Sequence, residues 1–519
     1  MVFEKRIDIG ITSEGNSVTQ TSDGGYFIGG DYLNTFSETQ IKPFVAKSDS
    51  NGNILWVRAL TSLTSGAVNS VISLFDGTSI AAGGGFSENI YDGEHLFVVT
   101  FDRNGNEVRS YLGDLISYDT LSGLPITISP SRDSGYILGA NGIDGIGKVL
   151  KFDKNGVVEW NISLRNDSSN AAKIDAIVEL SDGSFLIGAE DTLTAAADMV
   201  FTKLSHDRRF LWQRSIQKVG TLQGLTNTLD GGFAVTGIRQ ILPDFDEKVY
   251  VLKFDSNGSL HWNTVVEALG IEEAYAITES KNGDLIIAGS KLFFDPSTGN
   301  NEPSILLERI DKKGTPQSVI LVDLKSTISL GSQIVRTSDD GFVMTGYMSN
   351  NFPQPFSATQ SAIALKFDKD LHGCNIKEGL FTTIPFEIRF DSLTYYYTSE
   401  PVTTLSLGPG SFKSYKEGDL CDPFTYSEPP DAHIAVYPNP LSSDELLNLS
   451  FDGMIPAGSY MMVTRDILGR IIKKNVLPVT GSKEDIPIDL RGYPGGIYYV
   501  ELWNEDGSVF LRRIKFVKE

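Results

Sequence analysis

The chain has 519 residues, of which 40% are hydrophobic and 10% aromatic, with 51 Gly and 21 Pro against 7 Met. This composition excludes a disordered or fibrous chain, and its many turn-forming residues favour an all-β protein. Its 44 Lys and Arg against 66 Asp and Glu give a net charge of −22, which excludes nucleic acid and anionic membrane surfaces as favoured partners. Because no run of 18 apolar residues occurs, the sequence predicts no transmembrane segment.

The first residues, Met1–Arg6, lack the apolar core of a signal peptide. The chain is therefore expected to be either cytosolic or an exported protein whose signal peptide has been removed. The C-terminal motifs described below favour the exported protein.

One motif occurs seven times in the first two thirds of the chain. It is an acidic or Asn turn followed by a short apolar run that ends in two small residues. The copies are Asp23–Gly30, Asp76–Gly83, Asp133–Ala140, Asp182–Ala189, Asp230–Gly237, Asn282–Gly289 and Asp339–Gly346. Their spacing averages about 53 residues, near the length of a four-stranded propeller blade. The Asp-Gly pairs predict hairpin turns, and the apolar runs are too short for helices.

A second turn follows each copy, and in four repeats a tryptophan comes shortly after it: Trp56, Trp160, Trp212 and Trp262. We predict that these rings pack between adjacent blades. Phe3 precedes Asp23 by 20 residues, as Trp56 precedes Asp76, so residues 1–10 are expected to be the outer strand of the last blade. The sequence thus predicts a seven-bladed β-propeller over residues 1–374, closed by the N-terminal strand.

Residues 375–425 leave the repeat pattern but remain β-like, and we expect a small β extension packed on the propeller. Its candidate strands are Pro385–Phe390 and Tyr395–Thr398. The only two cysteines, Cys374 and Cys421, are a candidate disulfide if the protein is exported. A Pro-rich linker over residues 426–431 precedes the last module.

The last module, residues 432–519, carries four motifs in order, which end in the basic segment Arg512–Lys518. The motif residues are Tyr437, Pro438, Asn439, Pro440, Asp466, Gly469, Gly495 and Gly496. With these motifs the module resembles the type A C-terminal sorting domain of the type IX secretion system. The resemblance implies an immunoglobulin-like β-sandwich and the secretion machinery as a partner. It also implies export through the outer membrane of a Gram-negative bacterium, with the protein either released or attached to the cell surface.

The remaining motifs give no catalytic, cofactor-binding or metal-binding residue. The Asp-x-Asn-Gly turns at Asp49, Asp102, Asp153 and Asp255 resemble fragments of calcium loops, but they lack the full ligand run, and hairpin turns are expected there. The five His show no ligand spacing, and no short catalytic motif occurs. We therefore expect no cofactor.

Two functions stay open. The favoured hypothesis is an exported propeller that binds a surface protein or a glycan without catalysis. The alternative is a secreted polysaccharide hydrolase with its active site on the propeller face. The insertions Ile241–Glu247 and Lys291–Asn300 are candidate loops for either function. Two carboxylates roughly 5 to 10 Å apart in an aromatic-lined cleft would indicate the enzyme.

Overall fold

A computed structural model shows a chain of β-strands and turns that divides into two compact units, Met1–Cys421 and Asp422–Glu519. The structure describes residues 2–35, 38, 40–87, 90–115, 126–142, 146–166, 173–191, 198–217, 219–241, 246–268, 271–295, 300–324, 328–349, 360–379, 381–384, 388–391, 395–398, 416–419, 433–442, 445–452, 458–466, 471–479, 484–504 and 510–518. These residues include no helix, and thus no helix that could cross a membrane. The expected all-β class is confirmed.

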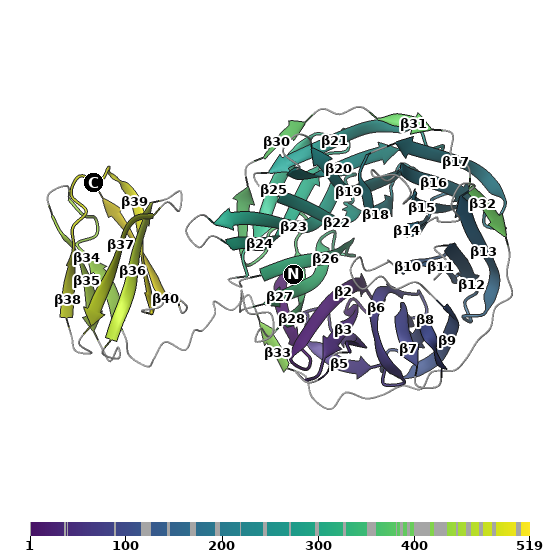
Figure 1. Ribbon diagram of the computed structural model, residues 1–519, viewed down its shortest axis with the longest axis horizontal. Coiled ribbons are helices and arrows are strands. Elements are labelled where there is room, and N and C mark those ends of the chain that lie inside the picture. Colours follow the sequence, from purple (N-terminus) through teal and green to yellow (C-terminus); the bar gives the residue numbers. More distant parts are fainter. Residues whose placement is uncertain are drawn as a thin grey trace. The chain divides into compact units, whose positions relative to one another are not determined.

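The first unit is a propeller-like repeat of antiparallel four-stranded sheets. Figure 1 shows them around a common axis, with the first strand of each sheet innermost. The first three sheets contain β2 (Thr12–Gln20), β3 (Tyr26–Leu33), β4 (Lys42–Ser48), β5 (Ile54–Ala59); β6 (Leu63–Ser73), β7 (Ser79–Ser87), β8 (Ile90–Phe101), β9 (Glu107–Leu115); β10 (Thr127–Pro130), β11 (Tyr136–Asn141), β12 (Gly147–Phe152) and β13 (Val158–Asn166). The next three contain β14 (Lys173–Glu179), β15 (Phe185–Asp191), β16 (Asp198–Leu204), β17 (Phe210–Gln217); β18 (Thr221–Asn227), β19 (Phe233–Ile241), β20 (Asp246–Phe254), β21 (Leu260–Ala268); β22 (Ile271–Glu279), β23 (Leu285–Asp295), β24 (Asn300–Ile310) and β25 (Pro316–Val322).

The last sheet of the repeat combines strands from both ends of the first unit. It contains β26 (Ile328–Arg336), β27 (Phe342–Ser349) and β28 (Gln360–Phe367), and β28 pairs with the N-terminal strand β1 (Phe3–Asp8). The β1–β28 ladder is antiparallel, with Phe3 opposite Lys366 and Ile7 opposite Ala362. The chain start therefore supplies the strand that follows β28 in this sheet.

A buried glutamate joins β1 to the segment after β28. The side chain of Glu4 is fully buried, and its carboxylate accepts hydrogen bonds from the backbone N–H of Cys374 at 2.8 Å and of Asn375 at 2.9 Å. The Asn375 Nδ2 adds a third bond at 2.6 Å. Since a buried carboxylate needs such donors, these bonds specify the register of β1.

The core of the first unit lies between neighbouring sheets. Each apolar cluster is shared by two consecutive sheets; in one, Phe27 on β3 packs with Val68 on β6 and Phe101 on β8. Another cluster joins the first sheet to the last through Ile28 and Val343. Burial of these side chains is the main favourable term that holds the sheets around the axis.

Residues 376–419 form short strands on the outside of the repeat. They are β29 (Ile376–Gly379), β30 (Phe381–Ile384), β31 (Arg389–Asp391), β32 (Tyr395–Thr398) and β33 (Lys416–Asp419). Strands β29, β30, β31 and β32 add a fifth strand to β25, β21, β17 and β13 in turn, and β33 pairs with β1. These strands pack on the propeller-like repeat in reverse order of its sheets and cover the sheet edges.

The repeated turn residue has a buried partner that the sequence analysis missed. In five repeats its carboxylate accepts a hydrogen bond from a lysine on the third strand, and all five lysines are buried. The pairs are Asp23–Lys47, Asp133–Lys151, Asp182–Lys203, Asp230–Lys253 and Asp339–Lys366, with distances between 2.6 and 3.1 Å. The turn thus fixes the first and second strands to the third.

The second unit has two antiparallel sheets around one apolar core. The first sheet contains β34 (His433–Tyr437), β35 (Leu447–Asp452) and β38 (Glu484–Ile488); the other contains β36 (Gly458–Asp466), β37 (Ile471–Val479), β39 (Gly496–Asn504) and β40 (Phe510–Lys518). Leu449 of the first sheet packs in the same cluster as Met462, Val500 and Phe516 of the other. This is a two-sheet sandwich.

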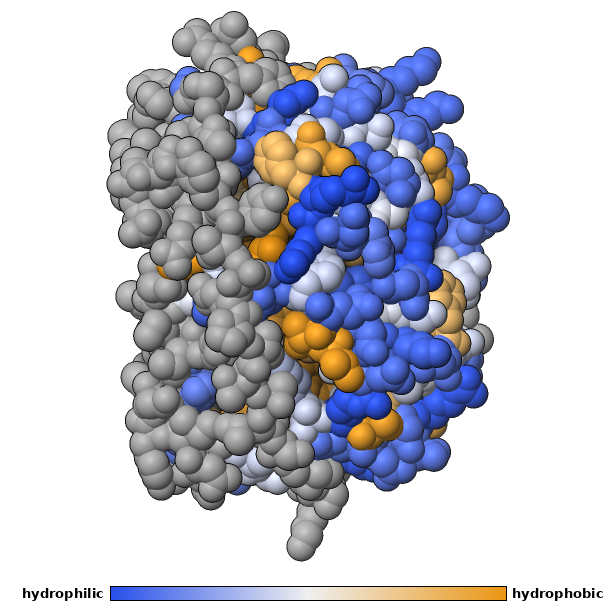
Figure 2. Space-filling view, turned by 90° about the vertical axis from the view of Figure 1, so that its right-hand side faces the viewer, coloured by the Kyte–Doolittle hydropathy of each residue, from blue (hydrophilic) through white to orange (hydrophobic). Residues whose placement is uncertain are grey.

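The outer side of the repeat is mainly hydrophilic. Figure 2 shows the side that carries β12, β13 and β17 in Figure 1, where hydrophobic side chains lie between hydrophilic ones. Val157 and Leu211, at the outer-strand hairpins, are 61% and 49% exposed. Hydrophobic residues scattered in this way are ordinary on a protein surface.

Substitution of Glu4 tests how β1 is held. Glu4→Ala leaves three donors without their acceptor, and we expect the free energy of unfolding to fall by about 3 kcal/mol in urea denaturation. Glu107→Gln, on the outer strand β9, is the control and should change stability by less than about 1 kcal/mol. Equal stability of Glu4→Ala and the natural protein would contradict the role of this contact.

The turn carboxylates predict a loss of stability in acid. Burial raises the pKa of Asp230, but hydrogen bonds from Lys253, Thr228 and Gly232 outweigh it and lower the pKa to about 2. A group with a lowered native pKa stabilises the protein above its ordinary value of 3.8, and this contribution is lost as the pH falls through about 2.

Asp230→Asn should therefore flatten the dependence of unfolding free energy on pH between 4 and 2. At pH 7 it should cost about 2 kcal/mol, since Lys253 is buried whereas Asp230 is half exposed. Asp76→Asn is the matched control, because Thr100 takes the place of the lysine in that repeat. If both variants give the same acid profile, the lysine pair is not the cause.

Candidate binding cavity

A cavity of about 770 Å³ lies along the axis of the first unit and is lined by the innermost strands. Every repeat contributes the residue that stands seven positions before its turn residue. These residues are Asn16, Asn69, Ile126, Asp175, Gln223, Tyr275 and Ser332, which we call the ring positions. Six of the seven are polar, so the cavity presents hydrogen-bonding groups from different directions.

A β-bulge explains why these side chains enter the cavity. In β2, β6, β14, β18, β22 and β26 the pairing register with the second strand shifts by one residue, and the extra residue is the ring position. A bulged residue leaves the ladder and re-aims its side chain. In the third repeat, Ile126 directly precedes the start of β10.

The paired small residues at the end of each repeat motif make room for this bulge. A Cβ at Gly30 would lie 1.9 Å from the Glu14 carbonyl oxygen, and one at Gly289 would lie 1.8 Å from that of Glu273. Glycine, which tolerates such a close approach of two backbones, holds this place in five repeats, whereas alanine holds it in the third and fourth. In those five repeats the glycine of the second strand lies against the inner strand beside the ring position.

The cavity is acidic. Among its lining residues are Glu14, Asp31 and Asp175, and no Lys, Arg or His is found among those that the structure describes. Burial and the nearby Asp31 raise the pKa of Glu14 to about 8, and burial raises that of Asp31 to about 6. Glu14 and Asp31 lie opposite each other on β2 and β3, so their side chains share one face of the sheet.

Asp31 and Asp175 each have one polar side chain as a partner. Asn16 Nδ2 donates to Asp31 Oδ2 at 3.0 Å and to the Val68 carbonyl at 3.1 Å. Lys173 Nζ lies 3.0 Å from Asp175 Oδ1, whereas Asp175 Oδ2 is buried without a partner among the described residues. Burial raises the pKa of Asp175 well above its ordinary value.

Two tyrosines line the cavity on the side of the sixth and seventh repeats. The Tyr275 hydroxyl donates to the Glu273 carboxylate. Burial, with the nearby carboxylates of Glu14 and Glu273, raises the pKa of Tyr347, so this hydroxyl stays protonated. Aromatic rings thus accompany the acidic pair Glu14–Asp31 in one cavity.

The four predicted tryptophans lie on outer strands, away from the cavity. The indole N–H of Trp56 donates to the Arg103 carbonyl and that of Trp262 to the Lys312 carbonyl, both at 3.2 Å, and each acceptor belongs to the next repeat. Trp212 makes the same kind of bond to Ser256 at 3.3 Å. Trp160 packs edge-on against Phe185 of the next sheet, with ring centroids 6.0 Å apart.

The Asp-x-Asn-Gly turns use their carboxylates internally. Asp102 Oδ1 accepts backbone N–H bonds from Asn104 and Asn106, each at 2.8 Å, and Asp49, Asp153 and Asp255 make the same two bonds. These are hairpin-turn contacts.

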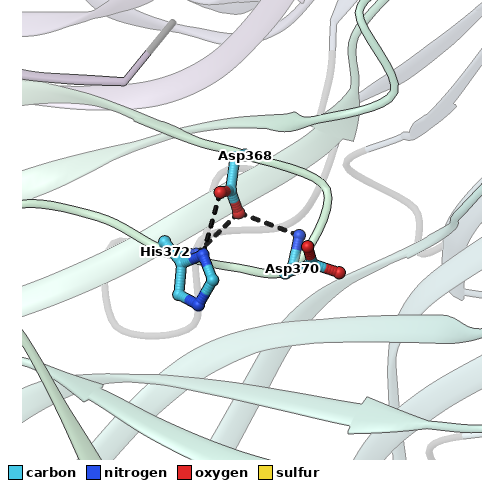
Figure 3. Close-up of side chains that lie close together, drawn as sticks. All are labelled: Asp368, Asp370 and His372. Carbon is cyan, nitrogen blue, oxygen red and sulfur yellow. Dashed lines mark hydrogen bonds and ion pairs between the residues drawn. The ribbon is translucent and has the colours of Figure 1, made fainter.

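One turn of this kind brings three metal-ligand side chains together. Figure 3 shows Asp368, Asp370 and His372 on the turn after β28, with ligand atoms within 4.8 Å of one another. Asp368 Oδ1 accepts the backbone N–H bonds of the other two residues, and His372 Nδ1 lies 2.9 Å from Asp368 Oδ2. The geometry matches that of the other turns, so we assign it a structural role.

The candidate loops and the cysteines fall partly outside the described residues. Ile241 ends β19 and Lys291–Asp295 belong to β23, so much of both insertions extends the strands. Residues 242–245 and 296–299 lie outside the described residues, as does Cys421. The disulfide of Cys374 with Cys421 stays a prediction.

The sorting-domain motif residues lie on several strands and turns of the second unit. The Tyr437 hydroxyl donates to Asp485 at 2.6 Å, and Asn439 Oδ1 accepts the backbone N–H of Val517 at 2.9 Å. Pro438 and Pro440 follow cis peptide bonds. Asp466 ends β36, Gly495 and Gly496 are exposed where β39 begins, and Gly469 lies outside the described residues.

The sequence analysis did not find the ring positions, although a signal was present. Their offset from the repeated turn residue is constant, but their chemistry differs from repeat to repeat. A search for residue types that recur in every repeat therefore does not detect the ring positions. Reading each repeat at a fixed offset from its turn would have isolated all of them.

Comparison with protein families identifies the end of the chain. A model of the secretion system C-terminal sorting domain matches residues 435–516. The predicted type IX sorting domain is confirmed, and this domain directs export through the outer membrane to the cell surface or the medium. No curated protein matches the chain.

Solved structures resemble the chain only distantly. A fungal alcohol oxidase of the AA5 family in complex with copper is 12% identical, with a TM-score of 0.43 over 100% of this chain and 99% of that one. The polysaccharide lyase Uly1 is 12% identical, with a TM-score of 0.43 over 69% and 90% of the two chains. Drosophila Semaphorin 1a is 10% identical, with a TM-score of 0.40 over 71% and 88%. At such TM-scores the likeness carries no argument about function.

Export gives a test of the second unit. A chain that lacks residues 435–516 should remain inside the cell envelope, whereas the full chain should reach the surface or the medium. Fractionation of the producing bacterium followed by immunoblotting measures the difference. Asn439→Ala should lower export in part, because Val517 at the end of β40 loses its acceptor. Export of the truncated chain at the full level would contradict the role of this domain.

Proposed function

We propose that the protein is an exported seven-bladed β-propeller that binds a ligand in its axial cavity without catalysis. The observation that carries this proposal is that one position of every repeat lines the same cavity, and that six of these seven residues are polar. Polar side chains directed into a preformed cavity by a regular scaffold are typical of a binding site.

Ring closure is part of this proposal. The β1–β28 ladder and the apolar cluster shared by the first and last sheets support a ring closed by the N-terminal strand. The indole contacts of Trp56, Trp212 and Trp262 with the following repeat support their role as locks between blades. A closed ring keeps the cavity walls at fixed distances, which reduces the entropic cost of binding.

The domain limits are proposed as residues 1–374 for the propeller and 432–519 for an immunoglobulin-like sorting domain. Residues 375–425 are the outer strands, and residues 426–431 the linker. The sorting domain is proposed to bind the secretion machinery, and the cavity to remain available to a ligand outside the cell.

Ser332→Tyr tests the cavity as the binding site. The same ring position holds a tyrosine in the sixth repeat, Tyr275, so the scaffold accepts this side chain, and the added ring reduces the space for a ligand. In a binding screen of the full chain against glycans and outer-membrane proteins, the variant should lose at least about tenfold in affinity.

Ser338→Tyr is the matched control, because Ser338 lies exposed on the turn that follows Ser332 in the same repeat. It should bind as the natural protein does, and thermal unfolding should show that both variants are folded. Binding that survives Ser332→Tyr unchanged would place the ligand elsewhere and contradict the proposal.

A second candidate function, polysaccharide hydrolysis, is favoured by the Glu14–Asp31 pair. Cross-strand neighbours have side chains about 5 Å apart, and a pKa of about 8 would keep Glu14 protonated at neutral pH, as a general acid requires. Tyr275 and Tyr347 in the same cavity meet the requirement for aromatic side chains.

A reducing-end assay on polysaccharides separates the two functions. We expect the full chain to release no product, and Glu14→Gln to behave as the natural protein does. Product release that falls by at least about 100-fold in Glu14→Gln would establish the hydrolase instead. The Gln side chain keeps the size of Glu14 but cannot donate a carboxylic proton.

A further inference from the structure

We infer that the axial cavity binds an uncharged carbohydrate, an inference that rests on the proposed binding function. The charge of the lining residues, the state of the three lining acids and the hydrogen-bonding groups of the ring positions each exclude or favour one class of ligand.

Anionic ligands are disfavoured because no cationic side chain is found among the described lining residues. The described lining residues include three acids and no cationic side chain, and the chain as a whole carries a net charge of −22. A phosphate, sulfate or uronate would meet carboxylates without the Arg or Lys that normally binds it. Such a ligand would lose its hydration on binding, and no cationic group among the described lining residues would replace it.

Cations are disfavoured because Asp31 and Asp175 each have one polar partner and Glu14 carries little charge. Asp175 is ion-paired with Lys173 at 3.0 Å, and Asp31 accepts the Asn16 amide at 3.0 Å. The raised pKa of Glu14, about 8, leaves this carboxyl mostly protonated at pH 7. Little free negative charge remains to hold a metal ion or an amine.

The neutral groups of the wall suit hydroxyl groups. Carboxamides at Asn69 and Gln223 and the hydroxyl of Ser332 can each donate and accept, as a sugar hydroxyl does. Asn69 and Ser332 make no hydrogen bond to another described residue. A protonated Glu14 can also donate and accept, so these four side chains can bind hydroxyl groups without charge.

The size of the cavity favours a short carbohydrate over a protein. A volume of about 770 Å³ lies within the range of roughly 300 to 1,000 Å³ of small-molecule sites. A stable protein interface needs about 800 Å² on each partner, more than the end of such a cavity presents. The Tyr275 and Tyr347 side chains add aromatic surface for the apolar faces of sugar rings.

The test uses the full chain and two panels of oligosaccharides, measured by isothermal titration calorimetry. One panel is uncharged (cello-, xylo-, manno- and maltotetraose), and the other is acidic (oligogalacturonate and chondroitin sulfate tetrasaccharides). We expect at least one uncharged member to bind with one site per chain, and no acidic member to bind. Asn69→Ala and Ser332→Ala should each weaken binding by about tenfold, since each removes one hydrogen bond.

Asn257→Ala is the matched control, because Asn257 is exposed on an outer turn, and it should bind as the natural protein does. Asn69→Lys adds a cation to the wall and should admit an oligogalacturonate that the natural protein rejects. This gain of binding also shows that the variant is folded.

Three outcomes separate this inference from the proposed function. Binding of an uncharged member that weakens in Asn69→Ala and Ser332→Ala supports both. Binding of only acidic members with the same sensitivity would keep the cavity as the binding site and overturn the inference. Binding that is unchanged in both Asn69→Ala and Ser332→Ala would overturn both. The absence of binding in either panel, together with unchanged affinity of Ser332→Tyr for its partner in the general screen, would also overturn both.

Discussion

The close approach of the first and second strands, at a glycine in five of the repeats, is the constraint on which the cavity depends. A side chain at Gly30 or Gly289 would collide with a carbonyl oxygen of the inner strand, so glycine permits the bulge beside it. The bulge then turns one side chain of the inner strand toward the axis. A small residue without a functional side chain therefore determines where a polar side chain of the cavity lies.

Within the four-stranded sheets, the residues that stabilise the fold differ from the residues that line the cavity. The turn carboxylate and its buried lysine, as in Asp230–Lys253, recur in five of the sheets, where they fix the strands of the sheet together. The ring position lies seven residues before the turn and leaves the hydrogen-bonded ladder, so its side chain is free to vary. Asn16, Asp175 and Tyr275 occupy the same place with different chemistry. A binding surface can thus change without loss of the fold.

The two ends of the first unit are held by different means. At the chain start, the Glu4 carboxylate binds the backbone after β28, and β1 supplies a strand to the last sheet. After β28, the chain covers sheet edges with β29, β30, β31 and β32 and returns to β1 through β33. Pairing of edges in this way removes open templates for aggregation, which matters for a protein that must survive outside the cell.

The sequence alone determined the β class, the repeat and the sorting domain, because turn glycines, short apolar runs and the motif from Tyr437 to Pro440 are local patterns. It predicted the strand Tyr395–Thr398, but it did not determine which sheets the outer strands join, since a strand of three or four residues carries no signal for its pairing partner. Nor did it determine the cavity. Glu14 and Asp31 are 17 positions apart, and Tyr347 is far from both in the chain. The β2–β3 pairing places Glu14 opposite Asp31, and only the curvature of the repeat around an axis brings Tyr347 of the last sheet to the same wall, because residues so far apart in the chain form no local pattern.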